Sequence, residues 1–253
     1  MILQKMTHAK SVWDRIPTSK YPPVPVFNFS NSHLKDPTAV IKIYNVSFGY
    51  SPPTVELENL DLALYIGDKI GLIGKNGSGK STFLKLLDGT LRETGGNIER
   101  RNGLKIVRFH QHHIERFDLD LSPVELFHEK FRLSSHDSRC YLGRFGLRDK
   151  LPLCKIRDLS GGQKMCLAMA ELSYSSPDVI LLDEPTNHLD METIKSLAEG
   201  IKKFEGAVII VSHNQYFLNN VTTALWIADK KKIKYYEGDL AQYKKEIKDQ
   251  LGI

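Results

Sequence analysis

Apolar and polar residues alternate along two stretches in the first third of the chain. The first stretch covers residues 40–48, the second covers residues 57–66, and a turn at residues 49–53 separates them. A period of two residues is typical of β-strands that bury one face. The two stretches therefore predict a pair of antiparallel strands.

Three other stretches are apolar without alternation, namely residues 69–73, 179–182 and 207–211. Continuous apolar runs of this length are typical of strands buried on both faces, as in a parallel sheet. Shorter alternating stretches after Gly95 and after Leu104 predict two more strands. The pattern as a whole indicates an α/β fold.

Helical patterns dominate between about residues 115 and 175. Ser122, followed by Pro123 and by Glu125 at the third position, is a typical helix start with a capping serine. A second helix is expected over residues 137–145, stopped by Gly146. We therefore expect a helical lobe inserted into the α/β domain.

The first 38 residues follow no strand or helix period. Prolines are spaced among polar residues there, at positions 17, 22, 23, 25 and 37. Such a composition is typical of a linker or of an extended segment that wraps around a domain. We expect residues 1–38 to be such a segment and residues 39–253 to form the folded domain.

Composition narrows the class of protein. A chain of 253 residues that is 41% hydrophobic can bury a sizeable core. No apolar run approaches the roughly 18 residues of a membrane span, so no membrane insertion is expected. Three cysteines without metal-ligand spacing predict reduced thiols and a cytoplasmic location. A net charge of +5 does not by itself indicate nucleic-acid binding.

The clearest candidate site is residues 74–81, Gly-Lys-Asn-Gly-Ser-Gly-Lys-Ser, which match the phosphate-loop pattern G-x-x-x-x-G-K-[ST]. Glycines permit positive φ, so that successive N–H groups can point at phosphate oxygens. Lys80 adds a positive charge, and the Ser81 hydroxyl can bind a metal ion. The expected helix over residues 82–87 would direct its N-terminus at the anion. The loop predicts a site for a nucleoside triphosphate with Mg²⁺.

A second anion-binding corner is predicted at residues 159–163, Leu-Ser-Gly-Gly-Gln, which precede another helical stretch. A serine and two glycines at a helix N-terminus leave N–H groups exposed at the positive end of the helix dipole.

Two of the buried runs end in residues that can act on a phosphate. Asp183 and Glu184 follow one run, and His213 follows the other. Ligands of open α/β sheets bind at the carboxyl ends of the strands. Asp183 can then hold Mg²⁺, Glu184 can position or deprotonate an attacking water, and His213 can contact a γ-phosphate. Tyr50, at the tip of the first strand, can stack on an adenine ring.

In order and spacing these motifs resemble an ATP-binding cassette (ABC) domain over about residues 40–250. Residues 182–190, Leu-Asp-Glu-Pro-Thr-Asn-His-Leu-Asp, resemble the ABC-F branch of cytosolic ATPases that act on ribosomes. Transporter cassettes usually carry a different pair at Asn187-His188. Residues 111–113, 119–123 and 236–243 resemble the second cassette of a eukaryotic ABC-F protein, and residues 1–38 resemble the end of the segment that joins the two cassettes.

The resemblance implies a P-loop core with a parallel sheet, an antiparallel β subdomain and an inserted helical lobe at about residues 115–175. It implies Mg²⁺-dependent ATP hydrolysis with Glu184, His213 and Gln111 as catalytic residues, and Ser81, Gln111 and Asp183 at the metal. The residues implied for ATP binding are Tyr50, Gly74, Asn76, Gly77, Ser78, Gly79, Lys80, Ser81 and Thr82.

The resemblance also implies a composite site. ATP on the phosphate loop of one cassette would meet Ser160, Gly161, Gly162 and Gln163 of another, with Asp190 communicating across the dimer. The partner would be a second cassette in the same parent chain or a second copy, and the parent protein would act on ribosomes as an ATP-driven clamp. An ATPase subunit of a membrane transporter and a regulatory module that binds ATP without hydrolysing it remain alternatives.

Three features depart from the family pattern. Asn214-Gln215 stand where the family often has an acidic and then a basic residue, which would weaken hydrolysis rather than binding. Lys164-Met165-Cys166 replace a more basic run, and the sequence offers no interpretation of that change. Because an ABC-F protein contains two cassettes, we expect this chain to be part of a longer protein.

Overall fold

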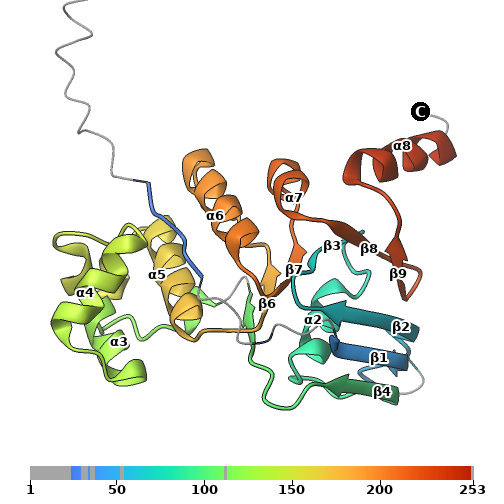
Figure 1. Cartoon of the computed structure of the whole chain (residues 1–253), viewed down its shortest axis with the longest axis horizontal. Helices are drawn as coiled ribbons and strands as arrows, with labels where there is room; N and C mark the ends of the chain where they lie inside the picture. The colour runs from blue at the N-terminus through green and yellow to red at the C-terminus, as the bar shows by residue number, and fades with distance from the viewer. Residues whose placement is uncertain (1–23, 30–33, 35–37, 52–53, 111–112, 252–253) are drawn as a thin grey trace, which may run out of the picture.

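A computed structural model of the chain describes residues 24–29, 34, 38–51, 54–110 and 113–251 (Figure 1). Its central sheet has six strands in the order β5-β6-β7-β3-β8-β9. Neighbouring strands run parallel except for β9, which is antiparallel to β8. The strands are β3 (Lys69–Gly74), β5 (Ile106–Phe109), β6 (Val179–Asp183), β7 (Ala207–Val211), β8 (Ala224–Asp229) and β9 (Lys232–Tyr236).

A second sheet has three antiparallel strands in the order β2-β1-β4. They are β1 (Ala39–Phe48), β2 (Leu57–Tyr65) and β4 (Gly95–Arg100). The predicted antiparallel pair and the predicted parallel strands are thus confirmed. In β1 the buried residues Ile41 and Ile43 alternate with the exposed residues Lys42 and Tyr44, and an irregularity in the pairing with β2 follows before Val46.

Helices surround the central sheet. They are α2 (Lys80–Leu87), α3 (Pro123–Phe131), α4 (Ser135–Arg144), α5 (Gly161–Tyr174), α6 (Met191–Lys203), α7 (Gln215–Val221) and α8 (Leu240–Leu251), with short 3₁₀ turns at Ile114–Arg116, Leu151–Leu153 and Ile156–Asp158. Figure 1 shows α3, α4 and α5 together at one end of the molecule and the three-stranded sheet at the other.

Two buried clusters lie on opposite faces of the central sheet, and β6 supplies both. Ile180 and Leu182 pack with residues of α5 and α6, whereas Val179 and Leu181 pack with α2 and the three-stranded sheet. This explains why the strand is apolar at every position. The sheet is therefore a middle layer between helices and the α2–antiparallel layer.

Capping serines begin the helices of the lobe, as predicted for α3. The Ser122 hydroxyl accepts a hydrogen bond from the Glu125 N–H, and the Glu125 carboxylate accepts one from the Ser122 N–H, at 3.3 and 2.7 Å. Helix α4 begins two residues earlier than expected, because Ser134 caps it by accepting from the Asp137 N–H. It ends at Arg144, and Gly146 follows with φ +82°, as predicted for a helix stop.

Part of the proline-rich segment belongs to the folded core. Residues 24–29, which we call the strap, run between α5 and α6 (Figure 1). Phe27 and Phe29 are only 3% and 4% exposed, and both belong to the cluster on the helical face of the sheet. The boundary at residue 38 stays a prediction, but two side chains that precede it are core residues.

Candidate nucleotide site

Three adjacent strands of the central sheet end at the candidate site. The phosphate loop follows β3, Asp183 ends β6, and His213 lies just after β7, the strand between them. Because the three strands are parallel, their carboxyl ends meet at one edge of the sheet. The strand order therefore brings together residues that are more than 100 positions apart.

The phosphate loop has the backbone that its glycines predict. Gly77 and Gly79 have φ of +79° and +89°. A Cβ on Gly74 would lie 2.3 Å from the Ala228 carbonyl oxygen, so no side chain fits there. The Lys80 ammonium donates to the carbonyl oxygens of Gly74 and Lys75, both at 2.8 Å, and is held inside the loop.

A cavity of about 550 Å³ opens at this edge. Nine predicted residues line it: Asn76, Gly77, Gly79, Lys80, Ser81, Thr82, Asp183, Glu184 and His213. Glu56, Asn187 and Val211 also line it and were not predicted. The Ser78 hydroxyl oxygen does not face this cavity: it is buried against Gly74 and has no hydrogen-bond partner among the described residues.

Glu184 and His213 form a pair at the cavity. The His213 N–H donates to Glu184 Oε2 at 3.3 Å, and His213 Nε2 lies 3.5 Å from Glu184 Oε1. Glu184 itself adopts a left-handed conformation with φ +54°, which turns it away from the line of β6. Burial raises the pKa of the Glu184 carboxyl, and the nearby negative charge of Asp183 adds to this, whereas His213 and Lys80 oppose it.

The pKa of Lys80 shifts in the opposite direction to that of Glu184. Burial lowers the pKa of its ammonium, while Asp183 and Glu184 hold the pKa up through their negative charge. The Lys80 ammonium thus shares one partly desolvated space with the carboxylates of Asp183 and Glu184, and Glu56 is a third carboxylate in the cavity wall.

Tyr50 lies beside the phosphate loop, although it does not line the cavity. Its hydroxyl oxygen is 3.1 Å from the Thr82 hydroxyl oxygen, and the edge of its ring meets Phe48 at 5.0 Å between ring centroids. The ring is 57% exposed. An exposed aromatic ring held beside the phosphate loop is suited to stack on a base.

The second predicted corner is an N-terminal cap. The Ser160 hydroxyl oxygen accepts from the Gln163 N–H at 3.3 Å, and Gln163 Oε1 accepts from the Ser160 N–H at 2.9 Å. These two bonds use the first and fourth N–H groups of the corner. The N–H groups of Gly161 and Gly162, at the first two positions of α5, keep the orientation of an anion site.

This corner opens into a different cavity of about 500 Å³. Its walls include Ser160, Gly162 and Gln163, residues 188–193, and Val24 and Pro25 of the strap. None of the described residues lines both this cavity and the phosphate-loop cavity. Asp190 lies in its wall as the cap of α6, where its carboxylate accepts from the Thr193 N–H at 2.8 Å.

The metal prediction is tested only in part. Ser81 and Asp183 line the same cavity, and their hydroxyl and carboxylate oxygens are the ligand type that Mg²⁺ prefers. Gln111 lies outside the described residues. Within the described part of the chain, no group of three or more His, Cys, Asp or Glu side chains could hold a metal ion.

Comparison with known proteins identifies the class. The family model described as ABC transporter matches residues 57–187, just over half of the chain. The chain therefore belongs to this family of ATP-binding cassettes, and its cassette is an ATPase. The predicted fold class and the predicted hydrolase activity are confirmed.

The curated relatives narrow the branch to ABC-F. "ABC transporter F family member 4" of Dictyostelium discoideum is 44% identical over 85% of this chain. "ATP-binding cassette sub-family F member 2" of Mus musculus is 41% identical over 86% of it, and "ABC transporter F family member 2" of Dictyostelium discoideum is 38% identical over 99%. The chain spans only 19%, 35% and 42% of the lengths of these three relatives.

A solved structure shows the same fold. "Structure of a bacterial Atm1-family ABC exporter with ATP bound" superposes with a TM-score of 0.70 over 97% of this chain and 45% of the exporter chain, at 18% identity. Among the described helices of the present chain, none has the length and apolar character needed to cross a membrane.

Proposed function

We propose that this cassette binds Mg-ATP as one half of a composite site and acts as an ATP-driven clamp within a cytoplasmic ABC-F protein. The observation that carries the proposal is that the two anion-binding corners open into separate cavities, whose walls have no residue in common in the part of the chain that the structure describes. Within one chain the two corners therefore face different spaces. A second cassette supplies the missing corner most simply.

Each cavity residue has a chemical task in this proposal. The N–H groups of the phosphate loop and the Lys80 ammonium bind the phosphates. Ser81 and Asp183 would hold Mg²⁺, which neutralises phosphate charge when bound. Tyr50 supports the adenine, and we retain Gln111 as a further residue at the metal.

Hydrolysis follows from the Glu184 and His213 pair. Glu184 orients a water molecule and accepts its proton as the water oxygen bonds to the γ-phosphorus and the bond to the bridging oxygen of ADP breaks. Because the pKa of Glu184 is raised, it lies closer to neutral pH, and the ionised carboxylate is a stronger base. His213 holds Glu184 in place and faces the departing phosphate.

Closure on ATP and release after hydrolysis would make the pair of cassettes a clamp. The ABC-F relatives, together with Asn187-His188, support a ribosomal partner for the parent protein. The ATPase subunit of a membrane transporter is the competing function. It predicts co-purification with a membrane protein.

The test is sedimentation of the Glu184→Gln parent protein with ribosomes through a sucrose cushion, with and without Mg-ATP. We expect ATP to move the variant into the ribosomal pellet, and Lys80→Ala to prevent this. A variant that closes or dimerises with ATP but stays in the supernatant would keep the clamp and exclude the ribosome as its partner. A variant that does neither would contradict both parts of the proposal.

A further inference from the structure

The strap is held by main-chain hydrogen bonds to three helices. The Val26 N–H donates to the Arg144 carbonyl oxygen at the end of α4, at 2.8 Å. The Ser173 hydroxyl of α5 donates to the Asn28 carbonyl oxygen at 2.8 Å, and the Ser196 hydroxyl of α6 donates to the Pro25 carbonyl oxygen. The strap therefore connects the helical lobe to α6, which belongs to the core.

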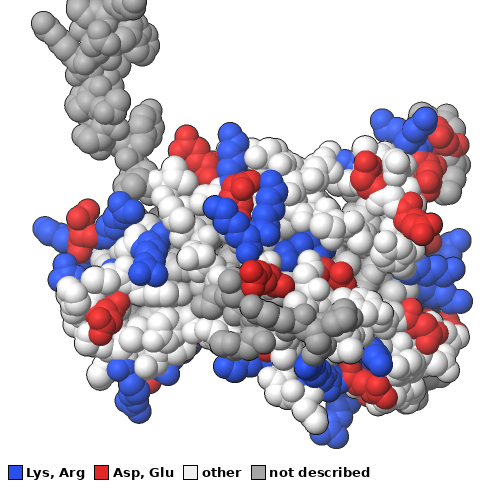
Figure 2. All heavy atoms as spheres, in the orientation of Figure 1, with Lys and Arg blue, Asp and Glu red and all other residues white. Residues whose placement is uncertain are grey.

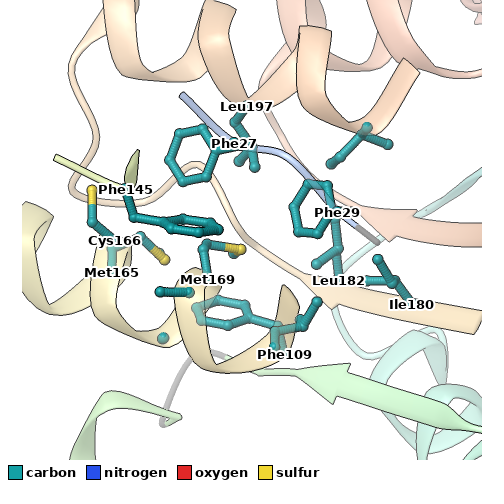
Figure 3. Packing of buried hydrophobic residues seen from close by; sticks show 14 of the residues in the cluster. Phe27, Phe29, Phe109, Phe145, Met165, Cys166, Met169, Ile180, Leu182 and Leu197 are labelled. Carbon is teal, nitrogen blue, oxygen red and sulfur yellow. The ribbon is translucent and has the colours of Figure 1, made fainter. Parts of the chain in front are cut away.

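The aromatic side chains of the strap reinforce the same connection. The Phe27 ring meets the Phe145 ring edge-to-face with centroids 5.8 Å apart, and Phe29 meets Phe204 at 6.0 Å. Figure 3 shows Phe27 between Phe145 and Leu197, with Phe29 over Leu182 of β6. Phe27 thus fills the space between the lobe and α6, while Phe29 anchors the strap to the core.

Two glycines make room for the strap. On α6, a Cβ at Gly200 would lie 2.5 Å from the Phe27 carbonyl oxygen and 2.8 Å from the Phe27 Cβ. At the end of α4, a Cβ at Gly146 would lie 3.2 Å from the Pro25 Cβ. Glycine inside a helix costs about 1 kcal/mol relative to alanine, so close approach of the strap is a physical reason for glycine at position 200.

The strap also reaches the corner that would complete a partner's site. Val24 and Pro25 form one wall of the cavity whose other walls include Ser160 and residues 188–193. We propose that the strap, through Phe27, positions the corner at residues 160–163 relative to α6, so that chain upstream of the cassette sets its ability to complete the ATP site of another cassette. The consequence for ATP rests on the function proposed above, whereas the positioning itself does not.

Two variants should prevent the strap from positioning the corner at residues 160–163, each in a different way. Phe27→Ala empties the space beside Phe145, whereas Gly200→Ala displaces the strap and improves the helix propensity of α6. Val26→Ala is the control for the first, because the Val26 side chain is 60% exposed. Gly143→Ala controls the second, since a Cβ there would meet nothing closer than Arg148 Cγ at 3.9 Å.

Amide hydrogen exchange of the full chain tests the positioning without nucleotide. Phe27→Ala and Gly200→Ala should speed exchange at the start of α5 by about tenfold while α2 keeps its protection, because only the lobe loosens. Phe27→Leu should restore most of the protection, and both controls should match the parent chain. Unchanged exchange in α5, or an equal rise in α2, would overturn the inference.

ATP-dependent association tests the consequence. In a Glu184→Gln background, both strap variants should weaken association by about tenfold and leave the affinity of the monomer for a fluorescent ATP analogue unchanged. If Glu184→Gln with an intact strap does not associate at all, the clamp proposal fails and the exchange experiment still decides the strap. If the strap variants associate as tightly as their background, the coupling to the second cassette is wrong.

Discussion

In the proposed function Glu184 is the base that acts on water, and its position follows from its backbone. The left-handed turn at φ +54° and the bond from the His213 N–H fix the carboxylate at the end of β6. A carboxylate held at a strand end and only 15% exposed is suited to accept a proton.

Replacing Glu184 by Gln should reduce ATP turnover by about 10²- to 10³-fold, because the amide cannot accept the proton. ATP affinity should remain, since the phosphate loop is intact. Steady-state phosphate release and binding of a fluorescent ATP analogue measure the two effects. Glu56→Gln is the matched control, because Glu56 lines the same cavity but does not lie at the end of β3, β6 or β7. An equal loss of turnover in both variants would assign no special role to Glu184.

The pKa of Glu184 makes turnover depend on pH. Burial raises this pKa above its ordinary value of about 4.3, and the base is active only when ionised. Turnover at saturating ATP should therefore rise with pH through an acid limb placed above that value. The residual activity of Glu184→Gln should lack the limb. A wild-type profile without a limb above the ordinary carboxyl range would contradict the role.

Lys69 gives a second pH effect, on stability rather than activity. The residue is 5% exposed, its ammonium donates to the Gly206 carbonyl oxygen at 2.7 Å, and burial lowers the pKa of that ammonium to about 8. Between this value and the ordinary value of about 10.4, the unfolded chain binds more protons than the native chain. The free energy of unfolding should rise with pH in that window relative to Lys69→Met. Denaturant titrations of both proteins at pH 7 and 9.5 measure the difference, which should not stay constant.

The N-terminal caps of α3 and α5 allow a role in stability to be compared with the proposed role in the composite site. The same reciprocal cap begins α3 at Ser122 and α5 at Ser160. Only the second cap opens into the cavity beside residues 188–193.

Ser122→Ala and Ser160→Ala should each lower the free energy of unfolding by about 1 kcal/mol, because each removes one cap. Only Ser160→Ala should also weaken ATP-dependent association in the Glu184→Gln background. Chemical denaturation and sedimentation velocity separate the two effects. Equal weakening in both variants would attribute the loss to the stability of the lobe.

Most elements could be predicted because each depends on a local pattern. The continuous apolar runs of β6 and β7 and the Ser122 cap specify their own structure. The missed residues depend on contacts from distant parts of the chain. Asn187 and Glu56 reach the cavity from loops without a periodic pattern, and Phe27 is buried only because α4, α5 and α6 meet around it.

At the scale of the whole molecule, the described charged side chains form no large patch of one sign on the face that Figure 2 shows. Lys and Arg side chains are interspersed there with Asp and Glu among the described residues. Cavities and corners, rather than a field of one sign, therefore define how this chain can recognise a partner.

Mixing two inactive chains should restore activity if the site is composite. Lys80→Ala removes the phosphate-binding cation, and Ser160→Arg blocks the second corner, so neither variant alone should hydrolyse ATP. In an equimolar mixture half of the random dimers contain one intact site, which predicts about a quarter of wild-type turnover. Colorimetric phosphate release measures it. A mixture as inactive as its components would indicate that each chain uses its own two corners.

The separation of the two cavities has a consequence for the nucleotide pool of a cell. A cassette that meets no partner can hold ATP in the phosphate-loop cavity but lacks the second corner beside it. If the site is composite as proposed, the geometry itself should suppress ATP hydrolysis by a cassette without a partner, and no dedicated inhibitor is required. The rate of ATP hydrolysis would then report how often two cassettes associate, and cassettes without a partner would remain bound to ATP.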